Sequence, residues 1–196
     1  MKLTESFYER TNVVKIAREL LGKGLFTNIN GIVTGGKIVE TEAYSWKEKG
    51  CHAFNGKITS RNEIMFENGG HAYVYLCYGM HHLFNVVTNK KGVAEAVLIR
   101  AIEPLVGLPV MQGRRGKVQR NVHLTSGPGK LTKALGIDRT FNGKYLLNRD
   151  VWIEDLGEKI ASRSIIAGKR IGIDYAGDDA LLPWRFMVKE SKWISK

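Results

Sequence analysis

Hydrophobic and polar positions along this chain follow two different periods, which separate one early helix from a series of strands. Apolar residues recur at positions 13, 16, 17, 20 and 21, the spacing of one helix face. Thr11 and Asn12 supply an N-cap before this stripe, and Gly22 ends it. The pattern therefore predicts a packing helix near the start of the chain.

Beyond Gly22 the apolar and β-branched residues alternate with polar ones, as in half-buried strands. The pattern predicts strands at about 24 to 27, 31 to 34 and 37 to 44. Between the last two, Gly35 and Gly36 predict a hairpin turn.

A second hairpin signal, Asn89 to Gly92, lies between two further strand-like runs at 82 to 87 and 94 to 99. Glycines and arginines from 107 to 123 predict a basic loop without regular structure. The following segment, 126 to 130, opens a predicted helix that runs through Leu135 to Gly136.

Length and composition favour one folded domain covering residues 1–196. The sequence is 43% hydrophobic and 25% charged, with only four prolines, and it contains no internal repeat or linker. Together with the mixture of helix and antiparallel strand patterns, this predicts a soluble single-domain α+β protein.

The charge is unbalanced, with 30 Lys and Arg against 19 Asp and Glu and a net charge of +11. Such an excess favours a polyanionic partner, with nucleic acid first and an acidic membrane surface second. The alternative is that the basic balance only keeps the protein soluble.

Cys51 and Cys77 are the only cysteines, and their spacing matches neither a disulfide framework nor a zinc ribbon. The first residues lack the apolar run of a signal peptide, and nowhere do 18 apolar residues follow one another. We therefore expect a protein of the reducing cytoplasm without a membrane span.

Candidate chemistry lies on the strand that ends near residue 44. A period of two puts Glu40, Glu42 and Tyr44 on one face. A face with two acids packs poorly in a core, so we expect it to border solvent or a pocket. With tyrosines nearby, that pocket is suited to stacking a flat and even cationic ring.

Two other motifs give little evidence of a function. The histidine pair at 81 and 82 and the Cys51-His52 pair lack a third and fourth ligand at suitable spacing, so no metal site is expected. The segment Gly127 to Leu131 is not a Walker loop, because leucine follows Lys130 and the first glycine is misplaced. Its use is rather a helix N-terminus that meets a phosphate.

Six ordered blocks together resemble the alkyladenine (3-methyladenine) DNA glycosylase family, from near residue 6 to the C-terminus. They are Ile38 to Tyr44; His52 to Phe54 with Thr59 to Asn62 and Met65-Phe66; Tyr73 to Tyr75 with Tyr78 to Met80; Leu98 to Ala101 with Glu103-Pro104; Leu124 to Pro128 with Lys130-Leu131; and Arg170 to Ile173 with Ala176-Gly177 and Arg185-Phe186. Six blocks in the same order are far more specific than any single short motif.

The resemblance implies a curved, mostly antiparallel sheet with peripheral helices and a protruding β-hairpin that contacts DNA. It also implies a monofunctional glycosylase of base excision repair, acting as a monomer without metal or cofactor on damaged double-stranded DNA from the minor groove side. In a bacterium such an enzyme would be cytoplasmic and associated with the nucleoid. Its substrates would be purines of the 3-methyladenine, 7-methylguanine, hypoxanthine and ethenoadenine class, flipped out of the duplex.

Site residues follow from the same resemblance, position by position. Glu42 corresponds to the general base that activates water, whereas Glu40 has the structural alternative of an ion pair with a neighbouring Arg or Lys, which we prefer for it. The flipped base would be enclosed by Tyr44, His52, Tyr75, Asn85 and Ile173. Tyr78 would intercalate, and the DNA backbone would be bound by Arg100, Lys130, Arg114 and Arg115.

Several alternatives stay open from the residues alone. Each tyrosine can be a core residue, His52 can be a hydrogen-bonded surface residue, and the basic loop residues can be solvated charges. A non-enzymatic nucleic-acid-binding module would tolerate the loss of Glu42. A carbohydrate hydrolase would use Glu40 and Glu42 as an acid and base pair, although two acids on one strand face fit that poorly.

Overall fold

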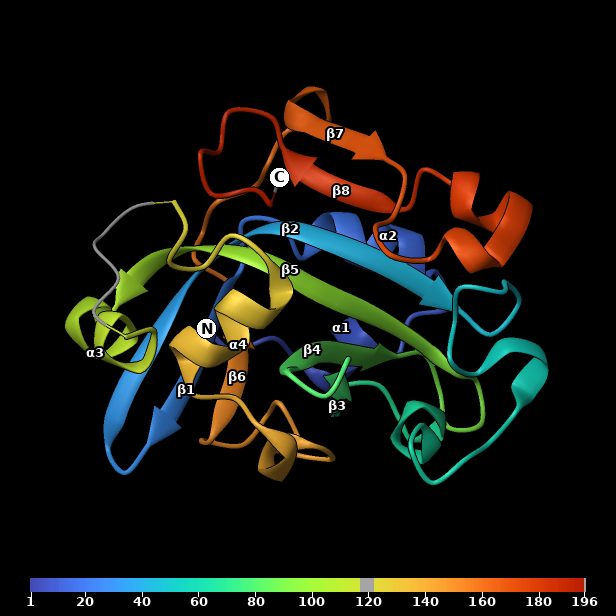
Figure 1. Ribbon diagram of the computed structural model, residues 1–196, viewed down its shortest axis with the longest axis horizontal. Helices are drawn as coiled ribbons and strands as arrows, with labels where there is room; N and C mark the ends of the chain where they lie inside the picture. Colours follow the sequence, from blue (N-terminus) through green and yellow to red (C-terminus); the bar gives the residue numbers. More distant parts are fainter. Residues whose placement is uncertain (117–121, 196) are drawn as a thin grey trace.

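A computed structural model describes residues 1–116 and 122–195, and it consists of one open antiparallel sheet with helices around it (Figure 1). The strands are β1 (Gly24–Ile29), β2 (Ile32–Ser45), β3 (Ala72–Cys77), β4 (His81–Thr88), β5 (Glu95–Val106), β6 (Val151–Glu154), β7 (Ile165–Gly168) and β8 (Arg185–Val188). Six of them follow the order β3-β4-β5-β2-β1-β6, and β8 joins the sheet through β2 and carries β7. The predicted α+β fold with a mostly antiparallel sheet is confirmed.

Short helices surround the sheet. They are α1 (Glu5–Tyr8), α2 (Val13–Glu19), α3 (Leu108–Arg114) and α4 (Pro128–Leu135), with 3-10 turns η1 (Phe54–Gly56), η2 (Glu63–Phe66), η3 (Arg139–Phe141), η4 (Ser162–Ser164) and η5 (Asp174–Leu181). The two predicted helices are confirmed as α2 and α4. Asn12 caps α2 by accepting a hydrogen bond from the Lys15 amide over 2.9 Å, and Gly136 ends α4 with a φ of 71°.

The long strand β2 connects the parts of the sheet, because it has partners on both sides. Along one side it pairs with β5, and along the other it pairs first with β1 and then, at Glu40 to Glu42, with β8. The pairing with β5 shifts register on either side of Glu40. Such an irregularity bends a strand and redirects its side chains, and it lies next to the candidate acids.

The predicted hairpin turn at Gly35 and Gly36 is wrong, because β2 runs through both glycines. The turn lies instead at Asn30 and Gly31, whose φ values of 53° and 81° suit a tight hairpin. A Cβ at Gly35 would come within 2.1 Å of the Phe26 ring. The glycine pair therefore allows close packing within the sheet and does not mark a turn.

The predicted basic loop at 107 to 123 is wrong in its first part, which forms α3. Gly107, with a φ of 75°, turns the chain out of β5, and Pro109 lies in the first helical turn, where proline is well tolerated. The side chain of Met111 is fully buried and anchors the helix. Of the rest of the predicted loop, residues 117–121 lie outside the described residues.

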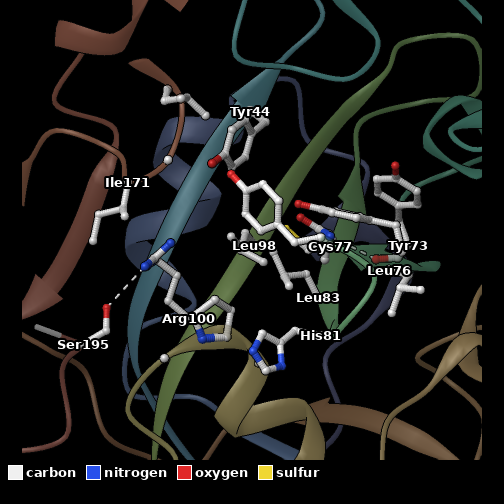
Figure 2. A pocket seen from close by; sticks show the side chains of 18 of the residues that line it. Tyr44, Tyr73, Leu76, Cys77, His81, Leu83, Leu98, Arg100, Ile171 and Ser195 are labelled. Atoms are coloured by element: carbon white, nitrogen blue, oxygen red, sulfur yellow. Dashed lines mark hydrogen bonds between the residues drawn. The ribbon is translucent and has the colours of Figure 1, made fainter. Parts of the chain in front are cut away.

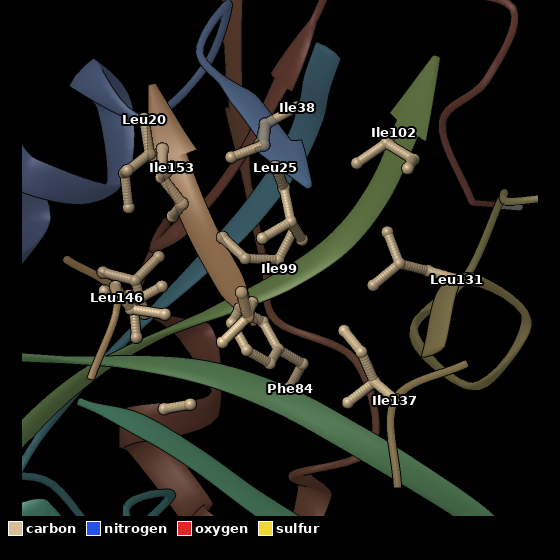
Figure 3. Close-up of a cluster of buried hydrophobic side chains, with 14 of the residues drawn as sticks. Leu20, Leu25, Ile38, Phe84, Ile99, Ile102, Leu131, Ile137, Leu146 and Ile153 are labelled. Carbon is tan, nitrogen blue, oxygen red and sulfur yellow. The ribbon is translucent and has the colours of Figure 1, made fainter. Parts of the chain in front are cut away.

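The main hydrophobic core lies between the sheet and the elements around it (Figure 3). Its members come from every part of the chain, among them Leu20, Leu25, Ile38, Phe84, Ile99, Ile102, Leu131, Ile137, Leu146 and Ile153. This core holds β2 and β5 rigidly, so side chains that leave these strands have fixed positions. Within the described ranges, the structure has no helix of the length and apolarity that a membrane span requires.

Candidate active site

A cleft of about 1090 Å³ opens over the middle of the sheet (Figure 2). Ile171 and Ser195 lie on one side of it, and Tyr73 and Leu76 lie on the other. Nine of the predicted site residues line it: Tyr44, His52, Tyr75, Tyr78, Asn85, Arg100, Arg115, Lys130 and Ile173. The fold thus brings together residues that the sequence spreads over more than a hundred positions.

Glu42 lies directly behind the lining of this cleft. Its Oε1 accepts hydrogen bonds from the Ile171 amide at 2.9 Å, and the Nη1 of Arg100 lies 3.2 Å from the same oxygen. Its Oε2 accepts the hydroxyl of Tyr44 at 2.8 Å. Three groups that belong to the wall of the cleft therefore fix both oxygens of one carboxylate.

Glu40 is held in a different way, by a buried ion-pair cluster. Its Oε1 lies 2.9 Å from Nε of Arg100 and 2.7 Å from Nε of Arg185. The preferred interpretation of Glu40 as an ion-paired strand acid is therefore confirmed. Both acids reach the same guanidinium of Arg100, so they lie on one side of β2, as the period of two predicts.

The face of β2 that carries the two acids does border a pocket, but through Tyr44 and not through the carboxylates themselves. Glu40 and Glu42 are both fully buried, and the cleft is lined by Tyr44 and Arg100 in front of them. Two carboxylates tolerate burial here because arginines neutralise them. Burial alone would lower the pKa of Arg100, but Glu42 and Glu40 outweigh it and raise that pKa above its ordinary value.

Tyr44 is fixed from behind by Arg170, whose role the sequence analysis missed. The Arg170 guanidinium lies 4.7 Å from the centroid of the Tyr44 ring and binds both oxygens of Glu48, at 2.6 and 2.7 Å. It also donates to the Ala43 carbonyl at 2.9 Å. Arg170 begins the last of the six blocks that carry the family resemblance, but its sequence position does not show which ring or carboxylate it contacts.

On the opposite side, His52, Tyr73 and Tyr75 form an aromatic corner. The Nδ1 of His52 is 2.8 Å from the Tyr73 hydroxyl, and its ring meets Tyr75 edge-on with centroids 4.7 Å apart. Burial, with the charge of Arg61 nearby, lowers the pKa of His52 to about 4. The imidazole is therefore neutral at physiological pH, and Tyr73 is a second residue that the sequence analysis did not single out.

Arg61 extends over this corner. Its guanidinium lies 4.8 Å from the centroid of the Tyr75 ring, within range of a cation–π contact. Arg61 is exposed and lines the cleft. A second tyrosine of the cleft, like Tyr44, therefore has an arginine against its ring.

Asn85 and Ile173 complete the lining. Asn85 is buried on β4 and donates its side-chain amide to the Tyr73 carbonyl at 3.0 Å, which fixes its orientation. Ile173 precedes η5, and its carbonyl accepts the Ala176 amide at 2.8 Å. Both residues are only 4 to 5% exposed, so each contributes a small, fixed surface to the cleft.

The turn between β3 and β4 carries Tyr78, which is 83% exposed although it is aromatic. Its φ of 49° and that of 69° at Gly79 close the hairpin tightly. Met80, in the same turn, is 72% exposed. The hairpin therefore exposes an apolar tip at the mouth of the cleft.

The basic candidates differ in their environments. Lys130, on α4, and Arg115, just after α3, both line the cleft. Arg114 does not, and its Nη1 donates within the protein to Thr34 Oγ1 at 3.0 Å and the Ala134 carbonyl at 3.3 Å. In the part of the chain that the structure describes, no three His, Cys, Asp or Glu side chains are grouped so that they could hold a metal ion.

Comparison with known proteins gives this arrangement its context. The family model of methylpurine-DNA glycosylases (MPG) matches residues 6–192. Relatives from Carboxydothermus hydrogenoformans and Alkaliphilus oremlandii are 48% and 44% identical, each aligned over the full length of both chains. A relative from Methanocella arvoryzae is 45% identical over 99% of this chain and 96% of its own. All three are provisionally named 3-methyladenine DNA glycosylases.

These matches define the class of protein: an enzyme that hydrolyses N-glycosyl bonds, with DNA as its substrate. The chain belongs to the methylpurine-DNA glycosylase family. This match confirms the resemblance and favours a glycosylase over both a non-enzymatic binding module and a carbohydrate hydrolase.

Proposed function

We propose that this protein is a monofunctional glycosylase of base excision repair that removes alkylated and deaminated purines from duplex DNA. The observation that carries the proposal is the Glu42 carboxylate, which Tyr44, Arg100 and the Ile171 amide hold against an aromatic cleft. Its substrates would belong to the 3-methyladenine, 7-methylguanine, hypoxanthine and ethenoadenine class. The product would be an abasic site.

A base inside a duplex cannot reach this cleft, so the damaged nucleotide has to be flipped out. Flipping costs a few kcal/mol, and less for a damaged or mispaired base. Tyr44, His52 and Tyr75 would enclose the flipped base, and Asn85 would reject guanine by contact with its exocyclic amino group. The Ile173 backbone amide would read the base edge.

Glu42 would orient and deprotonate the water that attacks the sugar C1′. Its Oε2 accepts the Tyr44 hydroxyl, so an incoming water would either share that oxygen, which has two lone pairs, or exchange with the hydroxyl. Arg100 and the Ile171 amide would keep the carboxylate in place in either case. A cationic purine is a ready leaving group, whereas hypoxanthine needs protonation as it departs.

Tyr78 would fill the space that the flipped nucleotide leaves, by insertion from the minor groove. Its exposure at the hairpin tip and its place at the mouth of the cleft support this role. Lys130 and Arg115 would bind backbone phosphates, and Arg100 a phosphate or ribose near the lesion, whereas Arg114 would reach a phosphate only with a donor that Thr34 and Ala134 leave free. We expect the protein to act as a monomer.

The proposal is tested by excision with excess chelator, on a duplex that carries one hypoxanthine and on alkylated genomic DNA. The wild type should release base and leave alkali-labile strands. Glu42→Gln should bind the duplex and release nothing, because an amide cannot take a proton from water. Glu103→Gln, which neutralises an acid paired with Lys37, is the matched control and should excise normally. Normal excision by Glu42→Gln would remove Glu42 from its role.

A further inference from the structure

Ser195 lies in the segment after β8, far along the chain from the acids of β2. It is nevertheless buried, at 7% exposure, and it lines the same cleft. Figure 2 shows it beside Arg100, whose Nη2 donates a hydrogen bond to the Ser195 hydroxyl at 3.4 Å. Buried polar groups are normally hydrogen-bonded, so the partners of Ser195 indicate what it does in this position.

Ser195 makes three short contacts with charged side chains. Its amide donates to Glu40 Oε2 at 2.6 Å, and its hydroxyl donates to Glu40 Oε1 at 2.7 Å. Its carbonyl accepts from Nη2 of Arg185 at 2.9 Å. One serine thus binds both oxygens of Glu40 and both arginines that pair with it, since its hydroxyl also accepts Nη2 of Arg100 at 3.4 Å.

The contacts continue from Glu40 to the proposed base. Glu40 accepts Nε of Arg100 at 2.9 Å, and Nη1 of the same guanidinium lies 3.2 Å from Glu42. Because a guanidinium is planar and rigid, fixing its Nε side also fixes the direction of its Nη atoms. The orientation of Arg100 toward Glu42 therefore depends on where Glu40 is held.

We propose that Ser195 is a positioning residue for the reaction: it locks the carboxylate of Glu40 and so holds Arg100 against Glu42. The inference rests on the proposed function of Glu42. Without the hydroxyl, Glu40 keeps its charge but loses one of the four donors that fix its rotamer, the others being the Ser195 amide and the Nε atoms of Arg100 and Arg185. The guanidinium of Arg100 then turns more freely, and misplacement by about 1 Å can cost on the order of 100-fold in rate.

The experiment measures single-turnover excision of hypoxanthine separately from affinity for a duplex with an uncleavable abasic-site analogue. Ser195→Ala should lower the rate constant about 10- to 150-fold, the range for a lost hydrogen bond to a charged group. Its affinity for DNA should stay close to that of the wild type, and its melting temperature should fall by about 3–10 °C, because the lost hydrogen bond also stabilises the fold. Ser195→Thr keeps a hydroxyl and should excise at close to the wild-type rate. Ser195→Val has the shape of threonine without the hydroxyl and should be as slow as Ser195→Ala.

Ser191→Ala is the matched control, since it removes a hydroxyl of the same segment that accepts the Trp193 amide at 3.2 Å and, among the described residues, has no hydrogen bond to Glu40 or Arg100. It should excise at the wild-type rate. An unchanged rate in Ser195→Ala, or equal rates in the Thr and Val variants, would overturn the proposal. If Ser195→Val fails to fold, the rates of Ser195→Ala and Ser195→Thr are compared instead, and equal rates in these two variants would overturn the proposal. Glu42→Gln is assayed in parallel, because excision by that variant would contradict the role of Glu42 and not that of Ser195.

Discussion

The hydroxyl of Tyr44 and the Oε2 of Glu42 are joined by a hydrogen bond of 2.8 Å across two positions of one strand. The bond occupies the oxygen that the attacking water would use. Burial, followed by the charge of Glu42, raises the pKa of Tyr44 well above its ordinary value, so the phenol keeps its proton and remains a donor. Because each carboxylate oxygen has two lone pairs, the phenol takes one acceptor position of Oε2 and limits the directions from which a water can approach it.

The first prediction concerns this bond. Tyr44→Phe keeps the ring that stacks on the base and removes only the competing hydroxyl, so it should excise hypoxanthine at least as fast as the wild type. Tyr44→Ala removes the ring and should weaken lesion binding by about 1 kcal/mol or more. Single-turnover rates and binding isotherms on the same duplex check both. A tenfold slower Tyr44→Phe would mean that the hydroxyl holds Glu42 in its active position.

A second prediction follows from the neutral imidazole of His52. Its pKa is about 4 in the folded protein, because of burial and then Arg61, against about 6.5 in an unfolded chain. Between these values the unfolded chain binds a proton that the folded protein does not bind. This contribution to stability is therefore present above pH 6.5 and is lost as the pH falls toward 4.

The expected loss from His52 between pH 7 and pH 5 is about 2 kcal/mol. Urea unfolding at the two values, compared between wild type and His52→Gln, measures it, because glutamine cannot titrate and still reaches the Tyr73 hydroxyl. The variant should lose about 2 kcal/mol less than the wild type over this interval. Equal pH dependence in the two proteins would mean that the imidazole titrates at its ordinary pKa.

Short-range pattern predicts only the shared face of Glu40, Glu42 and Tyr44, whereas the other candidate site residues come from the family resemblance. The period of two puts Glu40 and Glu42 on one side of β2, and both do reach Arg100. The sequence also predicts that Glu40 pairs with an Arg or Lys, although it does not say which one. The partners Arg185 and Ser195 were not predictable, because 145 and 155 residues separate them from Glu40 and only the assembled sheet brings them near.

The errors have a physical cause as well. Gly35 and Gly36 look like a turn, yet glycine also occurs where a backbone or ring approaches too closely for a Cβ, and sequence alone does not separate the two uses. The position of Arg170 behind Tyr44 was equally hidden. It depends on a buried pair with Glu48 across 122 residues.

A third prediction concerns the choice between cationic and neutral lesions. The Arg61 guanidinium lies 4.8 Å from the centroid of the Tyr75 ring, where its positive charge opposes a cationic base on the same aromatic corner. Arg61→Gln should therefore raise the excision rate of 7-methylguanine relative to hypoxanthine by about 2- to 5-fold, the equivalent of 0.5–1 kcal/mol.

The ratio of the two rates is the measurement, since a contact of Arg61 with a phosphate would affect both substrates equally and cancel. Arg163→Gln changes an exposed arginine on η4, outside the lining of the cleft, and serves as the control. A ratio that stays constant or falls in Arg61→Gln would show that the guanidinium does not oppose a cationic base.

The last prediction concerns Tyr78 at the tip of the β3–β4 hairpin. Because its side chain is 83% exposed, its loss removes little packing, and Tyr78→Ala should leave the melting temperature within about 2 °C of the wild type. The same change should weaken binding to a lesion duplex by about 1–3 kcal/mol, because the space left by the flipped nucleotide is no longer filled by a ring.

Ile32→Ala, at the exposed start of β2 and outside the cleft, is the control for general surface effects. If Tyr78→Ala bound and excised like the wild type, the hairpin tip would not be an intercalating group, and the apolar surface that it exposes would need another partner.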